Sequence, residues 1–307
     1  MSWIEILFFI FVGVLAWHYS VLYYNTRKNF PYLKKFSYVP LLHAYKETEQ
    51  KIYLGEKKAP RAVLLLHGFS SSVKDFGSLF ERLKEAKIPY FAPSITGFGL
   101  SDFHLLKVVQ PSDWLRDAFY AYDLLAAAAE KVDVIGFSNG GCLAAILAQN
   151  RPVGKLILAS PYLAPNPRDR LFYTLFRTPV FNRIVPFLIP LGKKPKLAGR
   201  SSTLDALDPK ASEGYFHDPY VTSQSVLALW ELQSQVHFSN KLLTNEVFGL
   251  FGSHDILIDL PKTKEIFLKN RPDHKLIEYP NSAHILFHDY AREQAIGDVM
   301  KILQSDS

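Results

Sequence analysis

The sequence predicts an α/β fold in which a mostly parallel sheet is flanked by helices and interrupted by a mainly helical insertion. Short apolar runs typical of buried strands alternate with stretches of helical spacing along most of the chain. This alternation stops between about Tyr162 and Ser239, where prolines and aromatic residues are frequent, and it returns at Glu246. Strands that are apolar throughout and alternate with helices are typical of parallel sheets covered on both faces.

The first element is an apolar stretch at the N-terminus. From Ile4 to Tyr24 the only full charge is Glu5, and about 21 residues at ~1.5 Å each reach ~31 Å, enough to cross a bilayer core of ~30 Å. Basic residues follow it, at Arg27, Lys28, Lys34 and Lys35. We therefore expect a single-pass membrane anchor with the catalytic domain in the cytoplasm. A cleaved signal peptide, which would need a basic start and a small-residue cleavage site, and a buried or partner-binding helix are the alternatives.

The remaining elements follow from apolar patterning. The expected strands end at glycine, proline or polar residues, and they cover Ala62–Leu66, Tyr90–Ala92, Val132–Ile135, Lys155–Ala159, Glu246–Gly252 and Lys275–Tyr279. Helical spacing predicts the helices Phe76–Ala86, Trp114–Glu130, Gly140–Gln149, Pro261–Asn270 and Tyr290–Gln304. The predicted domains are thus an anchor helix (1–28), a core in two parts (29–161 and 241–307) and a helical insertion (162–240).

Composition narrows the function classes. The chain has 307 residues, 48% of them hydrophobic, and a net charge of +6, which is an ordinary globular balance. Cys142 is the only cysteine, so an intrachain disulfide is impossible. No Cys/His cluster has zinc spacing and no nucleic-acid-binding motif is present, so we expect no metal, no cofactor and no nucleic-acid partner. A basic cluster at Lys193, Lys194 and Lys196 is interpreted mainly as a solvated face, with anionic lipid as the alternative.

The strongest chemical signal is a G-x-S-x-G element, Gly136-Phe137-Ser138-Asn139-Gly140. It lies directly after a predicted strand and directly before a predicted helix. A serine there occupies a sharp strand-to-helix turn, where neighbouring glycines avoid Cβ clashes and the helix N-terminus points free N–H groups at the hydroxyl. Ser138 is therefore the candidate nucleophile.

A nucleophilic serine needs a base and an acid that orients the base. Asp255 comes just after the strand that ends at Gly252, and His284 follows the strand that ends at Tyr279. Both lie at the carboxyl edge of the expected sheet, where sites form in open α/β folds. We assign His284 as the general base and Asp255 as its orienting carboxylate. Their rivals are Asp259, His274 and His288.

With these residues the sequence resembles the α/β-hydrolase superfamily, and within it the branch of monoacylglycerol lipases, lysophospholipases and serine aminopeptidase-like enzymes. The likeness rests on His67-Gly68-Phe69, Thr96-Gly97-Phe98-Gly99-Leu100-Ser101-Asp102, Gly136–Gly140 and the Asp255/His284 pair. The resemblance implies that the insertion is a cap domain. It also implies an oxyanion hole formed by the backbone N–H groups of Phe69 and Asn139. His67 is expected to be structural.

These features predict a serine hydrolase that cleaves lipid-like or medium-chain acyl esters, with membrane lipid beside it; the oligomeric state stays open. The apolar run Phe187–Leu191 either lines an acyl tunnel or packs against the main domain. An aminopeptidase or amidase on the same scaffold is the alternative, with Asp205, Asp208 and Glu213 holding a substrate amine. A membrane-tethered scaffold with a vestigial site is the third hypothesis.

Overall fold

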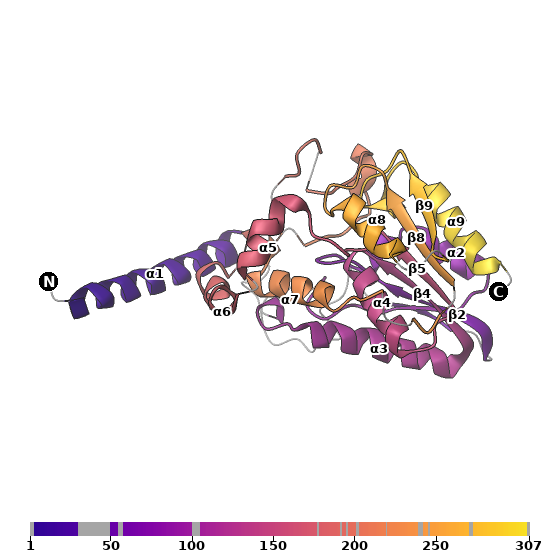
Figure 1. The fold of residues 1–307 in the computed structure, drawn as a ribbon, viewed down its shortest axis with the longest axis horizontal. Coiled ribbons are helices and arrows are strands. Elements are labelled where there is room, and N and C mark those ends of the chain that lie inside the picture. The colour runs from indigo at the N-terminus through magenta and orange to yellow at the C-terminus, as the bar shows by residue number, and fades with distance from the viewer. Residues whose placement is uncertain are drawn as a thin grey trace.

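The computed structural model describes residues 3–29, 50–54, 58–99, 105–176, 178–190, 192–194, 196–200, 203–218, 220–238, 242–244, 246–269 and 273–305. Its centre is a seven-stranded sheet in the order β1-β3-β2-β4-β5-β8-β9 (Figure 1). The strands are β1 (Lys51–Tyr53), β2 (Ala59–Leu66), β3 (Tyr90–Ala92), β4 (Ala129–Phe137), β5 (Lys155–Ala159), β8 (Glu246–Gly252) and β9 (Lys275–Tyr279). Only the edge strand β1 is antiparallel to its neighbour, so the predicted mostly parallel sheet is confirmed.

Helices cover both faces of the sheet. α3 (Pro111–Ala128), α4 (Asn139–Asn150) and α8 (Leu260–Leu268) contribute to one buried cluster, and α2 (Leu79–Glu85) and α9 (Arg292–Gln304) to the other. Alternate strand residues feed the two clusters: in β2, Leu64 and Leu66 join the first, and Val63 and Leu65 join the second. This burial on both sides explains why the strands are apolar throughout.

The element boundaries differ from the sequence predictions mainly at their ends. β3, β5, β8 and β9 have the predicted bounds, whereas β2 begins three residues earlier than predicted and β4 extends beyond its predicted bounds in both directions. The helix predicted from Phe76 divides into a 3-10 turn at Val73–Phe76 and α2. α3 begins at Pro111 with Gln110 as its cap, because Gln110 and Asp113 form a reciprocal capping box. Part of the predicted landmark Thr96–Asp102, namely residues 100–102, lies outside the described residues.

The segment between β5 and β8 is mainly helical, as expected. It contains α5 (Arg170–Phe176), α6 (Pro179–Leu188) and α7 (Ser223–Ser234). It also contains a small antiparallel pair, β6 (Gly192–Lys193) and β7 (Tyr220–Val221), which is too short to leave a pattern in the sequence. Residues of this segment line a pocket together with residues that follow β2 and β4. The segment therefore lies against the carboxyl edge of the sheet.

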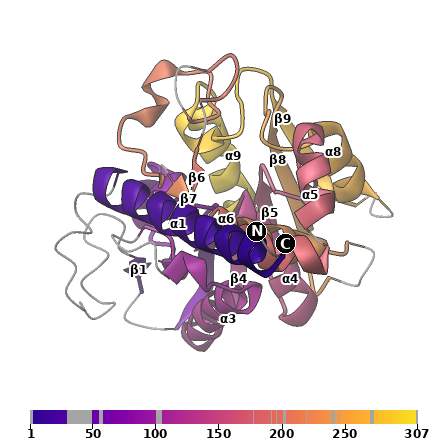
Figure 2. The ribbon, with the colours of Figure 1, turned by 90° about the vertical axis from the view of Figure 1, so that its left-hand side faces the viewer.

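The N-terminal helix α1 (Trp3–Asn29) extends away from the sheet and packs near α6 (Figures 1 and 2). Its side chains from Trp3 to Phe11 are largely exposed, including Phe8 at 61% and Phe9 at 61%. Within the described part of the chain, no helix is both long and apolar enough to cross a membrane. The predicted membrane-spanning anchor is therefore not supported. Lys34 and Lys35 lie outside the described residues.

Candidate active site

Ser138 lies in a tight turn between β4 and α4. Its backbone has φ 53° and ψ −115°, and α4 begins at the next residue. A Cβ atom at Gly140 would lie 1.9 Å from the carbonyl oxygen of Leu66, and one at Gly136 would lie 2.3 Å from the carbonyl oxygen of Gly140. Only glycine fits these two positions, because any Cβ would overlap backbone atoms. The glycines of the motif thus allow the strained turn that presents the Ser138 hydroxyl.

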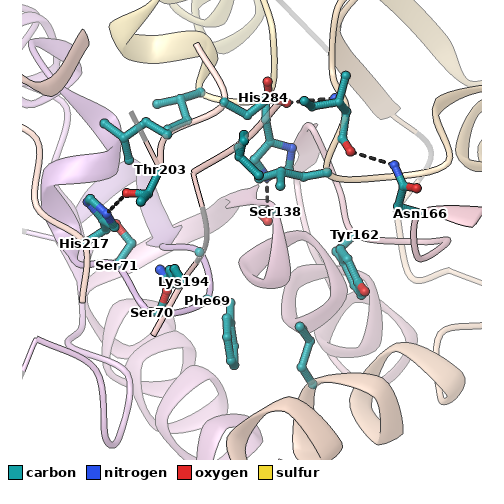
Figure 3. A pocket seen from close by; sticks show the side chains of 18 of the residues that line it. Phe69, Ser70, Ser71, Ser138, Tyr162, Asn166, Lys194, Thr203, His217 and His284 are labelled. Atoms are coloured by element: carbon teal, nitrogen blue, oxygen red, sulfur yellow. Dashed lines mark hydrogen bonds between the residues drawn. The ribbon is translucent and has the colours of Figure 1, made fainter. Parts of the chain in front are cut away.

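The structure brings Ser138, His284 and Asp255 together. Nε2 of His284 lies 2.8 Å from Oγ of Ser138, and Nδ1 lies 2.7 Å from Oδ2 of Asp255. Figure 3 shows His284 directly beside Ser138, with the hydrogen bond between them. The other carboxylate oxygen of Asp255 accepts hydrogen bonds from the backbone N–H groups of Leu257 and Ile258, which fixes the orientation of the carboxylate. All three side chains are buried.

The rival residues have other partners. Asp259 caps α8 by accepting a hydrogen bond from the N–H of Lys262. His274 is bonded through Nδ1 to the carbonyl oxygen of Phe267, and Nε2 of His288 to that of Lys74. None of the three occurs in the hydrogen-bonded chain from Ser138 to Asp255.

Opposing effects act on the pKa of His284. Burial lowers this pKa, but the charge and hydrogen bond of Asp255, with the charges of Asp205 and Asp75, outweigh burial and raise it above 6.5. The arrangement therefore stabilises the imidazolium that forms when His284 takes the proton of a serine hydroxyl.

Two buried side chains, His67 and Asp75, hold the loop after β2, residues 67–72, in place. Nε2 of His67 accepts a hydrogen bond from the N–H of Ile95, and burial lowers the pKa of His67 to about 4. His67 is therefore neutral and structural, as expected. The carboxylate of Asp75 accepts a hydrogen bond from the N–H of Gly68 at 2.7 Å and one from the hydroxyl of Ser71. No sequence pattern indicated Asp75, because its role depends on how the loop folds back.

The two predicted oxyanion donors lie at the ends of neighbouring strands. Phe69 belongs to the loop 67–72 and lines the pocket. Asn139 is the first residue of α4, so its N–H has no acceptor within the helix. Among the described residues, none accepts a hydrogen bond from either backbone N–H group.

The pocket that contains Ser138 and His284 has a volume of about 570 Å³, a size typical of small-molecule sites. Its apolar and aromatic lining side chains include Phe69, Phe137, Tyr162, Leu204, Leu229, Ile256, Leu257 and Ile285. Of the run Phe187–Leu191, Phe187 and Ile189 are exposed and do not line the pocket. The acyl-tunnel role is therefore not supported for these two side chains.

The three carboxylates proposed to bind a substrate amine either form ion pairs with arginines or lie outside the pocket. Asp205 lines the pocket, but it forms an ion pair with Arg200 at 2.6 Å and accepts the N–H of Ile256. Asp208 pairs with Arg292, and Glu213 is exposed outside the pocket. No group of three His, Cys, Asp or Glu side chains in the described residues is placed to hold a metal ion.

The three lysines of the basic cluster have different environments in the structure. Lys193 is exposed, whereas Lys194 and Lys196 line the pocket. Lys196 is also exposed, so the interpretation of the cluster as a solvated face is wrong only for Lys194, which is half-buried. Lys194 contacts Ser70, 124 positions away in the chain, so sequence spacing could not have found this contact. Thr203 and His217, which are hydrogen-bonded at 2.7 Å, are further pocket residues that the sequence did not indicate.

Known proteins are similar to this chain in sequence and in fold. A carboxylesterase of Bacillus subtilis (strain 168) is 24% identical over 251 residues, which cover 81% of this chain and 94% of that protein. Among solved structures, a monoacylglycerol lipase of Paleococcus ferrophilus has a TM-score of 0.65 at 19% identity, covering 82% of this chain and 98% of that one. A soluble variant of monoglyceride lipase from Saccharomyces cerevisiae has a TM-score of 0.66 at 17% identity, covering 83% and 90%.

The structural similarities show an α/β-hydrolase fold. The family described as serine aminopeptidase, S33, matches residues 57–291, which include Ser138, Asp255 and His284. This match extends over more than half of the chain, from before β2 to the beginning of α9. The chain therefore belongs to the serine aminopeptidase S33 family of hydrolases.

Proposed function

We propose that the protein is a serine hydrolase that cleaves carboxylic esters of lipid-like or medium-chain acyl groups. The observation that carries the proposal is the hydrogen-bonded chain from Ser138 through His284 to Asp255, which opens into a largely apolar pocket. The similarity to a carboxylesterase supports the ester class, and the apolar lining suits an acyl chain.

In the proposed mechanism, Nε2 of His284 takes the proton of Ser138 as Oγ attacks the ester carbonyl carbon. Asp255 holds the imidazole by its Nδ1–H and stabilises the imidazolium. The tetrahedral intermediate places negative charge on the former carbonyl oxygen. We assign the N–H groups of Phe69 and Asn139 to this charge, and one such donor typically contributes about 3–4 kcal/mol. His284 then protonates the leaving alcohol, and water activated by His284 releases the acid from Ser138.

An ester is preferred over a peptide because the pocket lacks an available carboxylate near its buried end. An aminopeptidase has to hold the charged amine of its substrate. Among the described lining residues, Asp205 is neutralised by Arg200, and the remaining carboxylate, Asp169, is exposed. We interpret the segment 162–240 as a cap that supplies Tyr162, Leu204 and Leu229 to the acyl site.

The nucleophile is tested with Ser138→Ala. We expect hydrolysis of p-nitrophenyl octanoate to fall by several orders of magnitude and labelling by a fluorophosphonate probe to disappear, with an unchanged melting temperature. Hydrolysis of aminoacyl-naphthylamides by the wild type separates the ester from the amide function. More than a tenth of the wild-type kcat in the variant, or faster amide than ester cleavage, would contradict the proposal.

The acid and base are tested with matched variants. Asp255→Asn should reduce kcat about 10⁴-fold, because the imidazole loses its orienting charge. Asp259→Asn and His288→Gln, which alter the nearest rivals, should retain most of the activity. Equal losses in Asp255→Asn and Asp259→Asn would show that the assignment of Asp255 is wrong.

We also propose that the enzyme works at a lipid surface, with the exposed apolar side chains of α1 and of the cap helix α6 resting on it. Phe8, Phe11, Phe181 and Ile184 are all at least 43% exposed, and α1 packs near α6, so these side chains belong to neighbouring elements. Aromatic side chains on such faces favour interfacial binding. The cytoplasmic location of the catalytic domain stays a prediction.

This place of action is tested by flotation of the full chain with phosphatidylcholine vesicles. Phe8→Ser combined with Phe11→Ser should reduce the bound fraction. The control is Tyr120→Ser, which removes an equally exposed aromatic residue on α3 and should leave binding unchanged. Equal binding of all three proteins would rule out the proposed surface.

A further inference from the structure

The pocket contains a cation that the proposed ester hydrolysis does not use. Lys194 follows β6 in the cap and lines the pocket with Phe69, Ser70 and Ser71 of the loop 67–72. Its Nζ donates a hydrogen bond to the hydroxyl of Ser70. Figure 3 shows Lys194 and Ser70 together beside Phe69, on the side of the pocket away from Asn166. A half-buried ammonium group is thus presented to the same cavity as Ser138.

The negative charges around Lys194 do not bind it directly. In the described part of the chain, Asp218 and Asp75 act on it through space, without a hydrogen bond or contact ion pair. Asp218 accepts instead from the N–H of Gly99, and Asp75 from that of Gly68. Among the described lining residues, Lys194, Lys196 and Arg168 are cationic, whereas Asp169 and Asp205 are the carboxylates, and Asp205 is already paired with Arg200. The lining therefore has an excess of positive charge.

Burial shifts the pKa values of the ionisable groups around Lys194. Burial lowers the pKa of Lys194 to about 8, with Asp218 and Asp75 acting in the opposite direction. Burial raises the pKa of Asp218 to about 7 and that of Asp75 to about 6. His217, which lines the same pocket, has its pKa lowered to about 4 by burial and by the charge of Lys194, so it is neutral. Lys194 therefore keeps its charge at pH 7, while Asp218 is partly neutralised.

We propose that the pocket binds acyl esters that carry an anionic group, carboxylate or phosphate, held by the ammonium of Lys194 and the hydroxyl of Ser70. This inference rests on the proposed ester hydrolysis. Ser70 directly follows Phe69, the assigned oxyanion donor, and adjacent Cα atoms are about 3.8 Å apart. The anion would thus lie only a few bonds from the ester carbonyl, as in an acylglycerol phosphate or an acylglycerate.

The test compares three substrates with one acyl chain at pH 7: 1-octanoylglycerol, its 3-phosphate and 3-O-octanoylglycerate. Active sites are counted with a fluorophosphonate probe. We expect the wild type to have a kcat/KM about tenfold or more higher for at least one anionic ester than for the neutral ester. The two anionic substrates show whether phosphate or carboxylate is the preferred group.

Lys194→Gln should lower kcat/KM for the preferred anionic ester about 10- to 100-fold, mainly through KM, and change the neutral ester less than threefold. Lys194→Arg should retain part of the preference. The exposed neighbour gives the control, Lys193→Gln, which should behave as the wild type. If Lys194 only tied the cap to the loop 67–72, its loss would slow all three substrates equally, and this result would overturn the inference.

The wild-type comparison decides the question even if Lys194→Gln does not fold. Hydrolysis of the neutral ester without any preference for the anionic esters would refute the anion site and leave the ester hydrolase intact. Failure to hydrolyse any of the three, with no fluorophosphonate labelling, would refute the proposed function itself.

Discussion

At the scale of single residues, the chemistry depends on the charge state of His284. A base has to be neutral to accept the proton of Ser138, and the pKa of His284 is raised above 6.5. Activity should therefore fall as the pH drops through a value above 6.5, because the imidazole becomes protonated. The acid limb of kcat/KM against pH for a neutral ester measures this pKa in the free enzyme. A midpoint at or below 6.5 would contradict the geometry.

The charge of Asp205 contributes to this shift, so Asp205→Asn should move the acid limb to lower pH. Arg200 would then lack its carboxylate partner, and its positive charge would also lower the pKa of His284. Asp208→Asn is the matched control, because Asp208 pairs with Arg292 and is not among the groups that act on His284. If both variants shifted the acid limb equally, the cause would be the change in net charge and not the loss of a charge close to His284.

At the scale of elements, the turn between β4 and α4 requires a close approach of two backbones. Gly140→Ala would place Cβ 1.9 Å from the carbonyl oxygen of Leu66, so α4 must move away from β2. We expect a loss of about 1–3 kcal/mol in the free energy of unfolding and a marked loss of activity, because Ser138 moves with the turn. Urea unfolding and p-nitrophenyl octanoate hydrolysis measure the two effects.

Gly297→Ala is the matched control for Gly140→Ala. It lies inside α9, and an added Cβ there would have no atom within 4 Å. Gly297→Ala should therefore stabilise the protein by up to about 1 kcal/mol through helix propensity, without a change in activity. Destabilisation by both substitutions to a similar degree would disprove the steric explanation for Gly140.

At the scale of the whole molecule, the two ends of the sheet have different roles. The carboxyl ends of the strands hold the site, and the opposite end is closed by a buried lysine. Nζ of Lys155 donates to the carbonyl oxygen of Ile302 at 2.7 Å and to Ser305, and its backbone N–H donates to Asp133. These bonds attach the end of α9 to β5.

Lys155→Met should lower the free energy of unfolding by about 2–4 kcal/mol, because buried carbonyl groups lose a charged donor and Asp133 loses a nearby cation. Activity per fluorophosphonate-labelled site should stay unchanged, since the site lies at the other end of the sheet. Lys131→Met, which replaces an exposed lysine of β4, should change stability by less than about 0.5 kcal/mol. An unchanged unfolding midpoint in Lys155→Met would refute this role.

The sequence by itself determined the sheet and the candidate site. Apolar strands, the glycines around Ser138 and the strand-end positions of Asp255 and His284 are local features, and a parallel sheet necessarily places its carboxyl ends at one edge. For this reason the order of the central elements and the grouping of the three site residues could be predicted. The structural role of His67 also followed from the sequence: the side chain is buried, and burial lowers its pKa to about 4.

Only the tertiary structure decided which charges meet. Lys193, Lys194 and Lys196 form one basic run in the sequence, but the turn after β6 sends Lys194 into the pocket and leaves Lys193 exposed. Asp205 was a candidate amine ligand by its sequence position, but in the structure it is paired with Arg200. Lys155 lies in an otherwise apolar strand, and its position in the sequence indicated no role. These contacts join residues that are far apart in the chain or that lie in irregular segments. Hydrophobic periodicity therefore does not predict them. The membrane-spanning helix expected over Ile4–Tyr24 is likewise not supported, since no helix in the described part of the chain is both long and apolar enough to cross a membrane.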